Sequence, residues 1–144
     1  MSGHTTNMWL LFAILSAVFA SATAILIKVG VRDVDSNLAT AIRTSVVLLL
    51  SWGIVWFSGV FAQVKTVPKH AWLFLILSGV ATGLSWLCYF KALQLGELSK
   101  VAPIDKLSVA LTILFAIFFL GETVDVKTIV GASVILVGVG ILVF

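Results

Sequence analysis

Residues 9–29 read WLLFAILSAVFASATAILIKV and contain a single charged side chain, that of Lys28. About 20 helical residues are needed to cross the ~30 Å hydrocarbon core of a bilayer. The stretch is therefore long and apolar enough to form a transmembrane helix. It is too long for a signal peptide, and no basic segment precedes it, so we expect it to be retained.

Four further apolar stretches of similar length follow the first. The predicted transmembrane helices cover residues 9–29, 38–58, 71–95, 101–120 and 127–144. Pro103 falls in the first turn of the fourth helix, where a missing N–H costs little. The connections are short, and the longest is GVFAQVKTVPK at residues 59–69. We therefore predict an all-α integral membrane protein, with one domain over residues 1–144 that folds as a five-helix transmembrane bundle.

The composition agrees with this interpretation. Hydrophobic residues make up 61% of the chain and charged residues 10%, whereas a soluble domain carries ~25% charged residues to keep its surface wetted. The net charge of +3 is too small to indicate a nucleic acid partner. We expect a multi-pass protein of a prokaryotic plasma or inner membrane, with the lipid bilayer as its first partner.

Residues typical of catalysis and metal binding are sparse. His4 and His70 are far apart in the sequence, and neither lies near Cys88, the single cysteine. A metal site needs several such ligands together, and a nucleophilic cysteine needs an activating base. The sequence therefore predicts no catalytic residue, no metal site and no cofactor.

Hydroxyl-bearing side chains recur at helical spacing on several predicted helices. The faces that they form predict a pathway for a small-molecule substrate, lined by Ser16, Thr23, Ser78, Thr82, Ser85, Trp86, Tyr89, Ser108 and Thr112. Such hydroxyls also bond to carbonyls of their own helix or join neighbouring helices. The sequence leaves both interpretations open.

Four charged residues fall inside the helices rather than in the connections. They are Arg43, Lys91, Asp105 and Lys106, all toward the membrane side that holds the C-terminus. Charge within a membrane is costly and usually serves a function. The lysines can extend to the interface, whereas Asp105 is too short to do so. We therefore predict a charge cluster in which Asp105 pairs with Arg43, with Lys106 or Lys28 as the alternative partner.

The fifth helix carries Gly131 and Gly138, seven residues apart on one face. Small residues allow helices to approach closely. We predict a packing contact on this face, either at a seam between subunits or inside one chain.

Four stretches resemble a known family. They are VDSNLATAIRT (34–44), GLSWLCYFKALQLGE (83–97), VAPIDKLSV (101–109) and FLGE (119–122). Through them the chain resembles the EamA family of the drug/metabolite transporter superfamily over essentially its whole length. The resemblance implies a five-helix repeat, of which larger relatives contain two in inverted orientation. It also implies that Pro103, Asp105 and Lys106 lie at one end of a central pathway.

The chain holds one such repeat, so the resemblance implies that the second half comes from another copy or another protein. We expect a secondary transporter of small metabolites or drugs that works by alternating access as an antiparallel homodimer. The cations at the helix ends favour one orientation only weakly, which is compatible with insertion both ways. The alternative is a non-transporting membrane subunit that supports a partner complex. The first helix offers only Ser16 and Thr23 where the related small multidrug resistance proteins carry a glutamate, so proton antiport of that kind is not expected.

Overall fold

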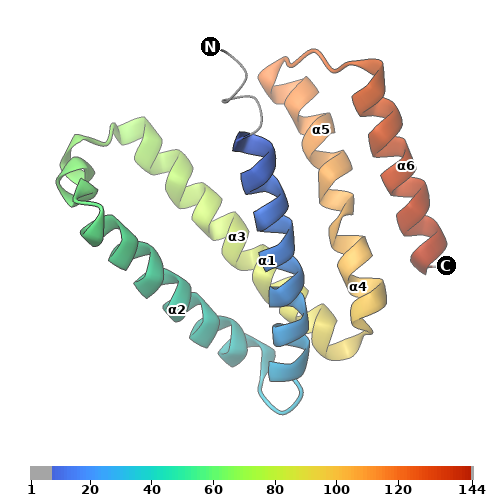
Figure 1. Ribbon diagram of the computed structural model, residues 1–144, viewed down its shortest axis with the longest axis horizontal. Helices are drawn as coiled ribbons and strands as arrows, with labels where there is room; N and C mark the ends of the chain where they lie inside the picture. The colour runs from blue at the N-terminus through green and yellow to red at the C-terminus, as the bar shows by residue number, and fades with distance from the viewer. Residues whose placement is uncertain (1–7, 144) are drawn as a thin grey trace. The chain divides into compact units, whose positions relative to one another are not determined.

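The computed structural model describes residues 8–143, and every regular element among them is a helix (Figure 1). The elements are α1 (Met8–Gly30), α2 (Ser36–Phe57), the 3₁₀ helix η1 (Val60–Thr66), α3 (Lys69–Leu95), α4 (Leu98–Asp105), α5 (Leu107–Leu120) and α6 (Val126–Val143).

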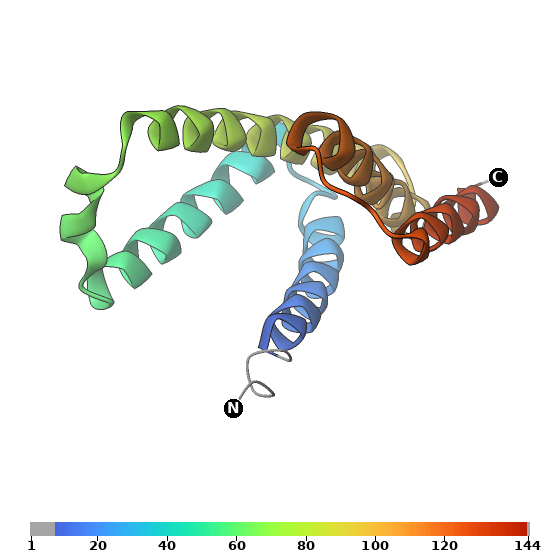
Figure 2. The ribbon, with the colours of Figure 1, turned by 90° about the horizontal axis from the view of Figure 1, so that it is seen from above.

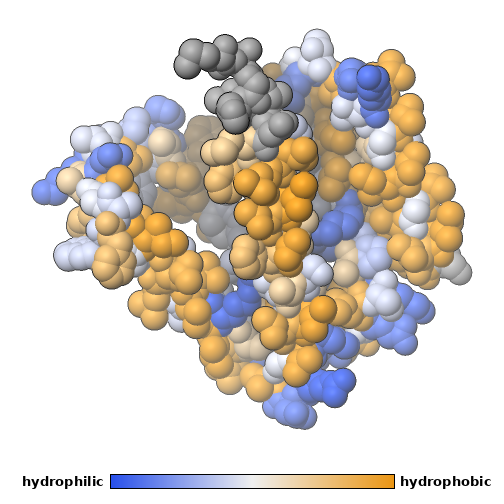
Figure 3. Space-filling model, in the orientation of Figure 1, coloured by the Kyte–Doolittle hydropathy of each residue, from blue (hydrophilic) through white to orange (hydrophobic). Residues whose placement is uncertain are grey.

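Among residues 8–143, five helical spans are long and apolar enough to cross a membrane, with α4 and α5 together forming the fourth, Leu98–Leu120. This confirms the predicted all-α membrane fold. No more than 6% of the most apolar window of any span is buried, and apolar side chains cover the visible faces of the helices (Figure 3). Exposed apolar surface on this scale marks contact with lipid or with another protein.

The described residues fall into two compact units, residues 8–26 with 95–143 (unit 1) and residues 27–94 (unit 2). The single domain over residues 1–144 therefore stays a prediction. Within unit 2, α2 and α3 converge at the α1–α2 turn and diverge toward η1 (Figures 1 and 2).

The core of unit 2 lies where these helix ends converge. Its buried side chains are Ile27, Val31, Ser36, Thr40, Phe90 and Leu93. Asp35 caps the start of α2, since its carboxylate accepts the N–H groups of Asn37 at 2.9 Å and Leu38 at 3.2 Å. The buried hydroxyl of Thr40 donates to Ser36 O at 2.8 Å, so its burial leaves no donor unpaired.

The connection after α2, predicted from the sequence only as the longest one, contains a helical turn and an aromatic cluster. Gly59 adopts φ 72°, a left-handed conformation that glycine takes without steric cost. The chain then forms η1, whose Phe61 ring packs against the rings of Trp52 and Trp56 at centroid distances of 5.9 and 5.8 Å. These aromatic contacts fasten η1 to the end of α2.

In unit 1, α6 packs against both α4 and α5. Gly121 ends α5 at φ 66°, and the N–H of Glu122 donates back to Ala116 O at 3.2 Å, a glycine-based helix end. Val139 of α6 is buried at 7% exposure.

The fourth helix differs from its prediction. It begins at Leu98 rather than 101, because Glu97 O accepts the N–H groups of Lys100 and Val101. Pro103 therefore lies in the second turn, where it cannot supply an N–H to the helix ladder. The helix is interrupted three residues later, at Lys106, whose N–H donates to Pro103 O at 2.9 Å, three residues back instead of four.

Asp125 stands just before α6, and its pKa gives the start of this helix a pH dependence. Its carboxylate accepts the hydroxyl and the N–H of Thr128, and these hydrogen bonds lower the pKa of Asp125 below its ordinary value. A lowered pKa means that the cap is fully present above the ordinary aspartate range and is lost as the pH falls through the lowered value.

We expect Asp125→Ala to speed amide exchange at residues 126–129 roughly fivefold at neutral pH. Hydrogen exchange with mass spectrometry in nanodiscs measures this. Asp125→Asn is the matched control, because asparagine caps equally well but does not titrate. Asp125→Asn should keep the slow exchange of the wild type, and the protection of these amides relative to an unfolded chain should no longer depend on pH. Equal exchange in the wild type and Asp125→Ala at neutral pH would contradict the capping role.

Candidate functional site

A cation beside two aromatic rings is the main polar feature of unit 2. Arg43 projects from α2, and its guanidinium carbon lies over the Trp86 ring, 4.2 Å from the centroid. The Phe90 ring is 5.7 Å away. Trp86 and Phe90 are four residues apart on α3, so both rings lie on one face of that helix. A cation over an aromatic face is stabilised by the ring quadrupole.

No carboxylate neutralises Arg43 inside unit 2. The acidic residues between 27 and 94 are Asp33 and Asp35, and Asp35 is engaged as the cap of α2. Among the described residues of unit 2, Arg43 makes no hydrogen bond or ion pair. A guanidinium carries five N–H donors, so those of Arg43 can serve an acceptor.

A second set of contacts fastens the end of α3 to the α1–α2 turn, and we name it the turn clasp. Its members are Lys28, whose Nζ donates to Leu93 O at 2.6 Å, and Gln94, whose Nε2 donates to Val34 O at 3.2 Å and Val31 O at 3.5 Å. Carbonyls at helix ends lack hydrogen-bond donors within their own helix, and the side chains of the turn clasp supply those donors. Gln94 was not among the residues predicted from the sequence. Its signal was an amide in the last turn of an apolar helix, which needs a partner.

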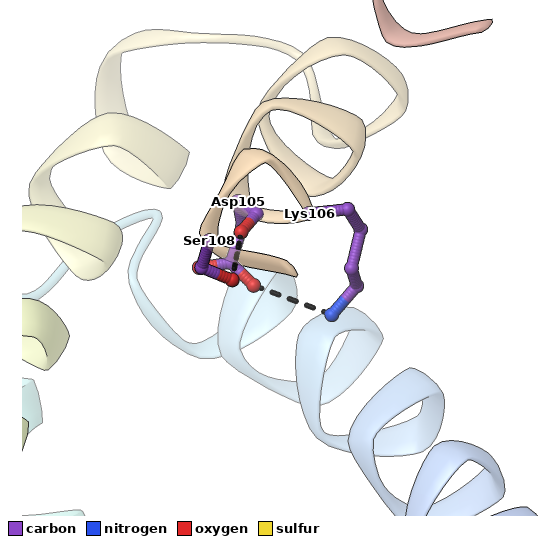
Figure 4. A network of polar contacts seen from close by, with 3 residues as sticks. All are labelled: Asp105, Lys106 and Ser108. Atoms are coloured by element: carbon purple, nitrogen blue, oxygen red, sulfur yellow. Dashed lines mark hydrogen bonds and ion pairs between the residues drawn. The ribbon is translucent and has the colours of Figure 1, made fainter. Parts of the chain in front are cut away.

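The predicted charge cluster is distributed over the two units. In unit 1, Lys106 Nζ lies 3.3 Å from Asp105 Oδ2, with the side chains 59% and 41% exposed (Figure 4). Lys106 is thus one of the partners expected for Asp105. In unit 2, Lys91 Nζ donates to Gln94 Oε1 at 3.1 Å, beside the turn clasp. Pairing of Asp105 with Arg43 stays a prediction, since the two residues belong to different units.

Several predicted pathway hydroxyls bond to their own helices. The hydroxyls of Thr82 and Thr112 donate to carbonyls four residues back, at 2.9 and 2.8 Å. Ser108 donates to Asp105 O at 2.7 Å (Figure 4). These three contacts fit the local interpretation of the hydroxyls, although each oxygen can still accept a hydrogen bond.

The pathway itself stays a prediction. Its residues on α3 lie in unit 2, and those on α5 and the first part of α1 lie in unit 1. The exposed members are Ser16, Ser78, Thr82, Ser85, Ser108 and Thr112, and the half-buried ones are Thr23, Trp86 and Tyr89. Among these residues, Trp86 is the one whose ring contacts the guanidinium of Arg43.

The glycine face of α6 has room beside it. A Cβ placed at Gly131 or Gly138 would meet no described atom within 4 Å. Close packing inside unit 1 therefore does not use these glycines, and their role at a subunit seam stays a prediction.

Unit 2 also has a hollow of about 550 Å³, lined by Trp56, Phe61, Ala62, Val64 and Lys65. Trp56 lies thirteen residues beyond Arg43 on α2, or about 20 Å along the helix axis. The hollow is thus separate from the Arg43 site. Among residues 8–143, no group of three or more histidine, cysteine, aspartate or glutamate side chains could hold a metal ion.

Comparison with known proteins agrees with the motifs found in the sequence. The model of the EamA-like transporter family matches residues 7–144. A protein of Sinorhizobium sp. named "uncharacterized transporter in cobO 3'region" is 45% identical over 133 residues, which cover 92% of this chain and 94% of the relative. No solved structure gives a significant match. With its five apolar spans, this multi-pass membrane protein belongs to the EamA-like transporter family.

Proposed function

We propose that the chain is one half of a secondary transporter of small metabolites or drugs, and that two antiparallel copies complete it around a midplane site. Membership of a transporter family supports transport as the role. One observation supports the proposed assembly, namely that residues 8–143 contain five candidate spans. An odd count puts the two ends of a repeat on opposite sides of the membrane. Two parallel copies cannot form an inverted pair, whereas two antiparallel copies can.

Polar side chains and small residues on the spans support the presence of a second copy. Lipid can cover exposed apolar side chains, but it offers no hydrogen-bond partner to the exposed hydroxyl of Ser85 or to the half-buried Arg43. The space beside Gly131 and Gly138 would also allow a helix of another copy to approach α6 closely. We expect alternating access to arise when one copy rocks against the other around the site.

Two single-cysteine variants test the assembly, since Cys88→Ser removes the only native cysteine. In that background, Asp33→Cys lies in the connection after the first span and Thr123→Cys in the connection after the fourth. Both positions are exposed. Three spans separate them, so they are expected on opposite sides of the membrane. For a chain that inserts both ways, we expect a membrane-impermeant maleimide to label each variant to roughly half in intact cells.

Permeabilised cells give the full labelling of each variant and serve as the control. Complete labelling of one variant and none of the other would exclude the antiparallel homodimer. Transport would then require a different partner chain, or the chain would act as a non-transporting membrane subunit.

A further inference from the structure

The position of Arg43 places a positive charge inside a membrane span. Arg43 follows the capping residue Asp35 by two helical turns, about 12 Å along the axis of α2. Charged groups at such depth are costly, and they mark substrate pathways or pair with another group. Within unit 2 the pairing groups are the rings of Trp86 and Phe90 and not a carboxylate.

The rings hold the guanidinium in a fixed place before any ligand arrives. Phe90 is 2% exposed and belongs to the core of unit 2, so it forms an immobile wall. Trp86 is half-buried on the same face of α3, one turn earlier. A cation that is already positioned loses little side-chain freedom when it binds an anion, which favours affinity.

The electrostatics of unit 2 favour an anion. Its basic residues are Lys28, Arg32, Arg43, Lys65, Lys69 and Lys91, and its acidic residues are Asp33 and Asp35. The edge of a guanidinium matches the two oxygens of a carboxylate in a bidentate hydrogen-bonded pair. The indole of Trp86 gives the site an apolar surface beside the charge, as small-molecule sites usually have.

We infer that Arg43, held over Trp86, binds the carboxylate of a small organic acid whose apolar part lies against the aromatic surface. This inference rests on the proposed transport function and assigns its substrate class. The site lies within unit 2, on α2 and α3, and each copy of the chain carries one.

The test compares acids with uncharged analogues on the protein in lipid nanodiscs. The probes are benzoate, phenylacetate, indole-3-acetate and lactate, each beside its primary amide. A ligand that binds the folded state raises the unfolding temperature. We expect at least one acid to raise it and its amide to have no effect. Arg43→Gln should weaken the binding of that acid roughly 10- to 100-fold, which corresponds to the loss of a charged hydrogen-bonded pair.

Arg32→Gln is the matched control, because Arg32 is an exposed arginine in the α1–α2 turn. It should leave acid binding unchanged. Arg43→Lys keeps the charge but loses the paired N–H donors of the guanidinium, so it should retain weak acid binding. Retained binding would show that the loss in Arg43→Gln does not come from misfolding. No stabilisation by any acid, equal stabilisation by acids and amides, or full acid binding in Arg43→Gln would overturn the inference. A neutral or cationic compound that stabilises the protein independently of Arg43 would overturn it while leaving the transport function standing.

Discussion

Leu93→Ala is expected to lower the free energy of unfolding by about 2–5 kcal/mol, the usual loss when a fully buried leucine is truncated. Leu93 has 0% exposure and lies in the core of unit 2, beneath the α1–α2 turn. Its truncation leaves a cavity in the core of unit 2, where Val31 and Phe90 are also buried. Unfolding of the purified protein in nanodiscs, followed by circular dichroism, measures the loss.

Leu95→Ala is the matched control for this prediction. Leu95 is the same residue type two positions along α3, but it is 77% exposed. Its truncation should cost about 0.5 kcal/mol or less. Equal losses for the two variants would mean that the core of unit 2 does not form as described.

Gln94→Met is expected to give the second-largest loss, about 1–3 kcal/mol, because two carbonyls then lose their donor. The carbonyls are those of Val31 and Val34, at the ends of the α1–α2 turn. Methionine has a similar volume, so the packing is largely kept and the loss reports the hydrogen bonds of the turn clasp.

Hydrogen exchange gives this prediction a local measurement. Amides in the turn, residues 31–35, should exchange faster in Gln94→Met than in the wild type, while amides in the middle of α6 should not change. Gln63→Met, on the exposed surface of η1, is the matched control and should leave both regions unaffected. Unchanged exchange at the turn in Gln94→Met would show that the clasp does not hold it.

The five spans could be predicted from the sequence because each is a long apolar block, and this signal does not depend on tertiary contacts. The ends were harder to place. The fourth helix begins three residues earlier than predicted, since a backbone carbonyl at Glu97 starts its ladder. A 3₁₀ helix within residues 59–69 gave no periodic signal. Its stability comes from the packing of Phe61 on Trp52 and Trp56, which only the fold brings together.

The candidate site was predicted in its residues but not in its contacts. Arg43 and Trp86 were both identified, the first as a member of an ion pair and the second as part of a pathway. Their contact joins residues more than forty positions apart, and helical periodicity within one segment carries no information about which faces of two helices meet. Gln94 was missed for the same reason, because its carbonyl partners lie 60 and 63 positions earlier. By contrast, the contact of Asp105 with Lys106 is local and was among the alternatives named from the sequence.

The exposure of the spans links the thermal stability of this protein to the ratio of protein to lipid in the membrane. No more than 6% of the most apolar window of any span among residues 8–143 is buried, so in the proposed homodimer a second copy would cover part of this exposed surface. Stability gained through association depends on concentration by mass action. For a protein confined to a bilayer, the relevant concentration is its mole fraction among the lipids. The same chain should therefore lose thermal stability as lipid is added at constant protein, and the midpoint of that dilution would give the dissociation constant of the pair.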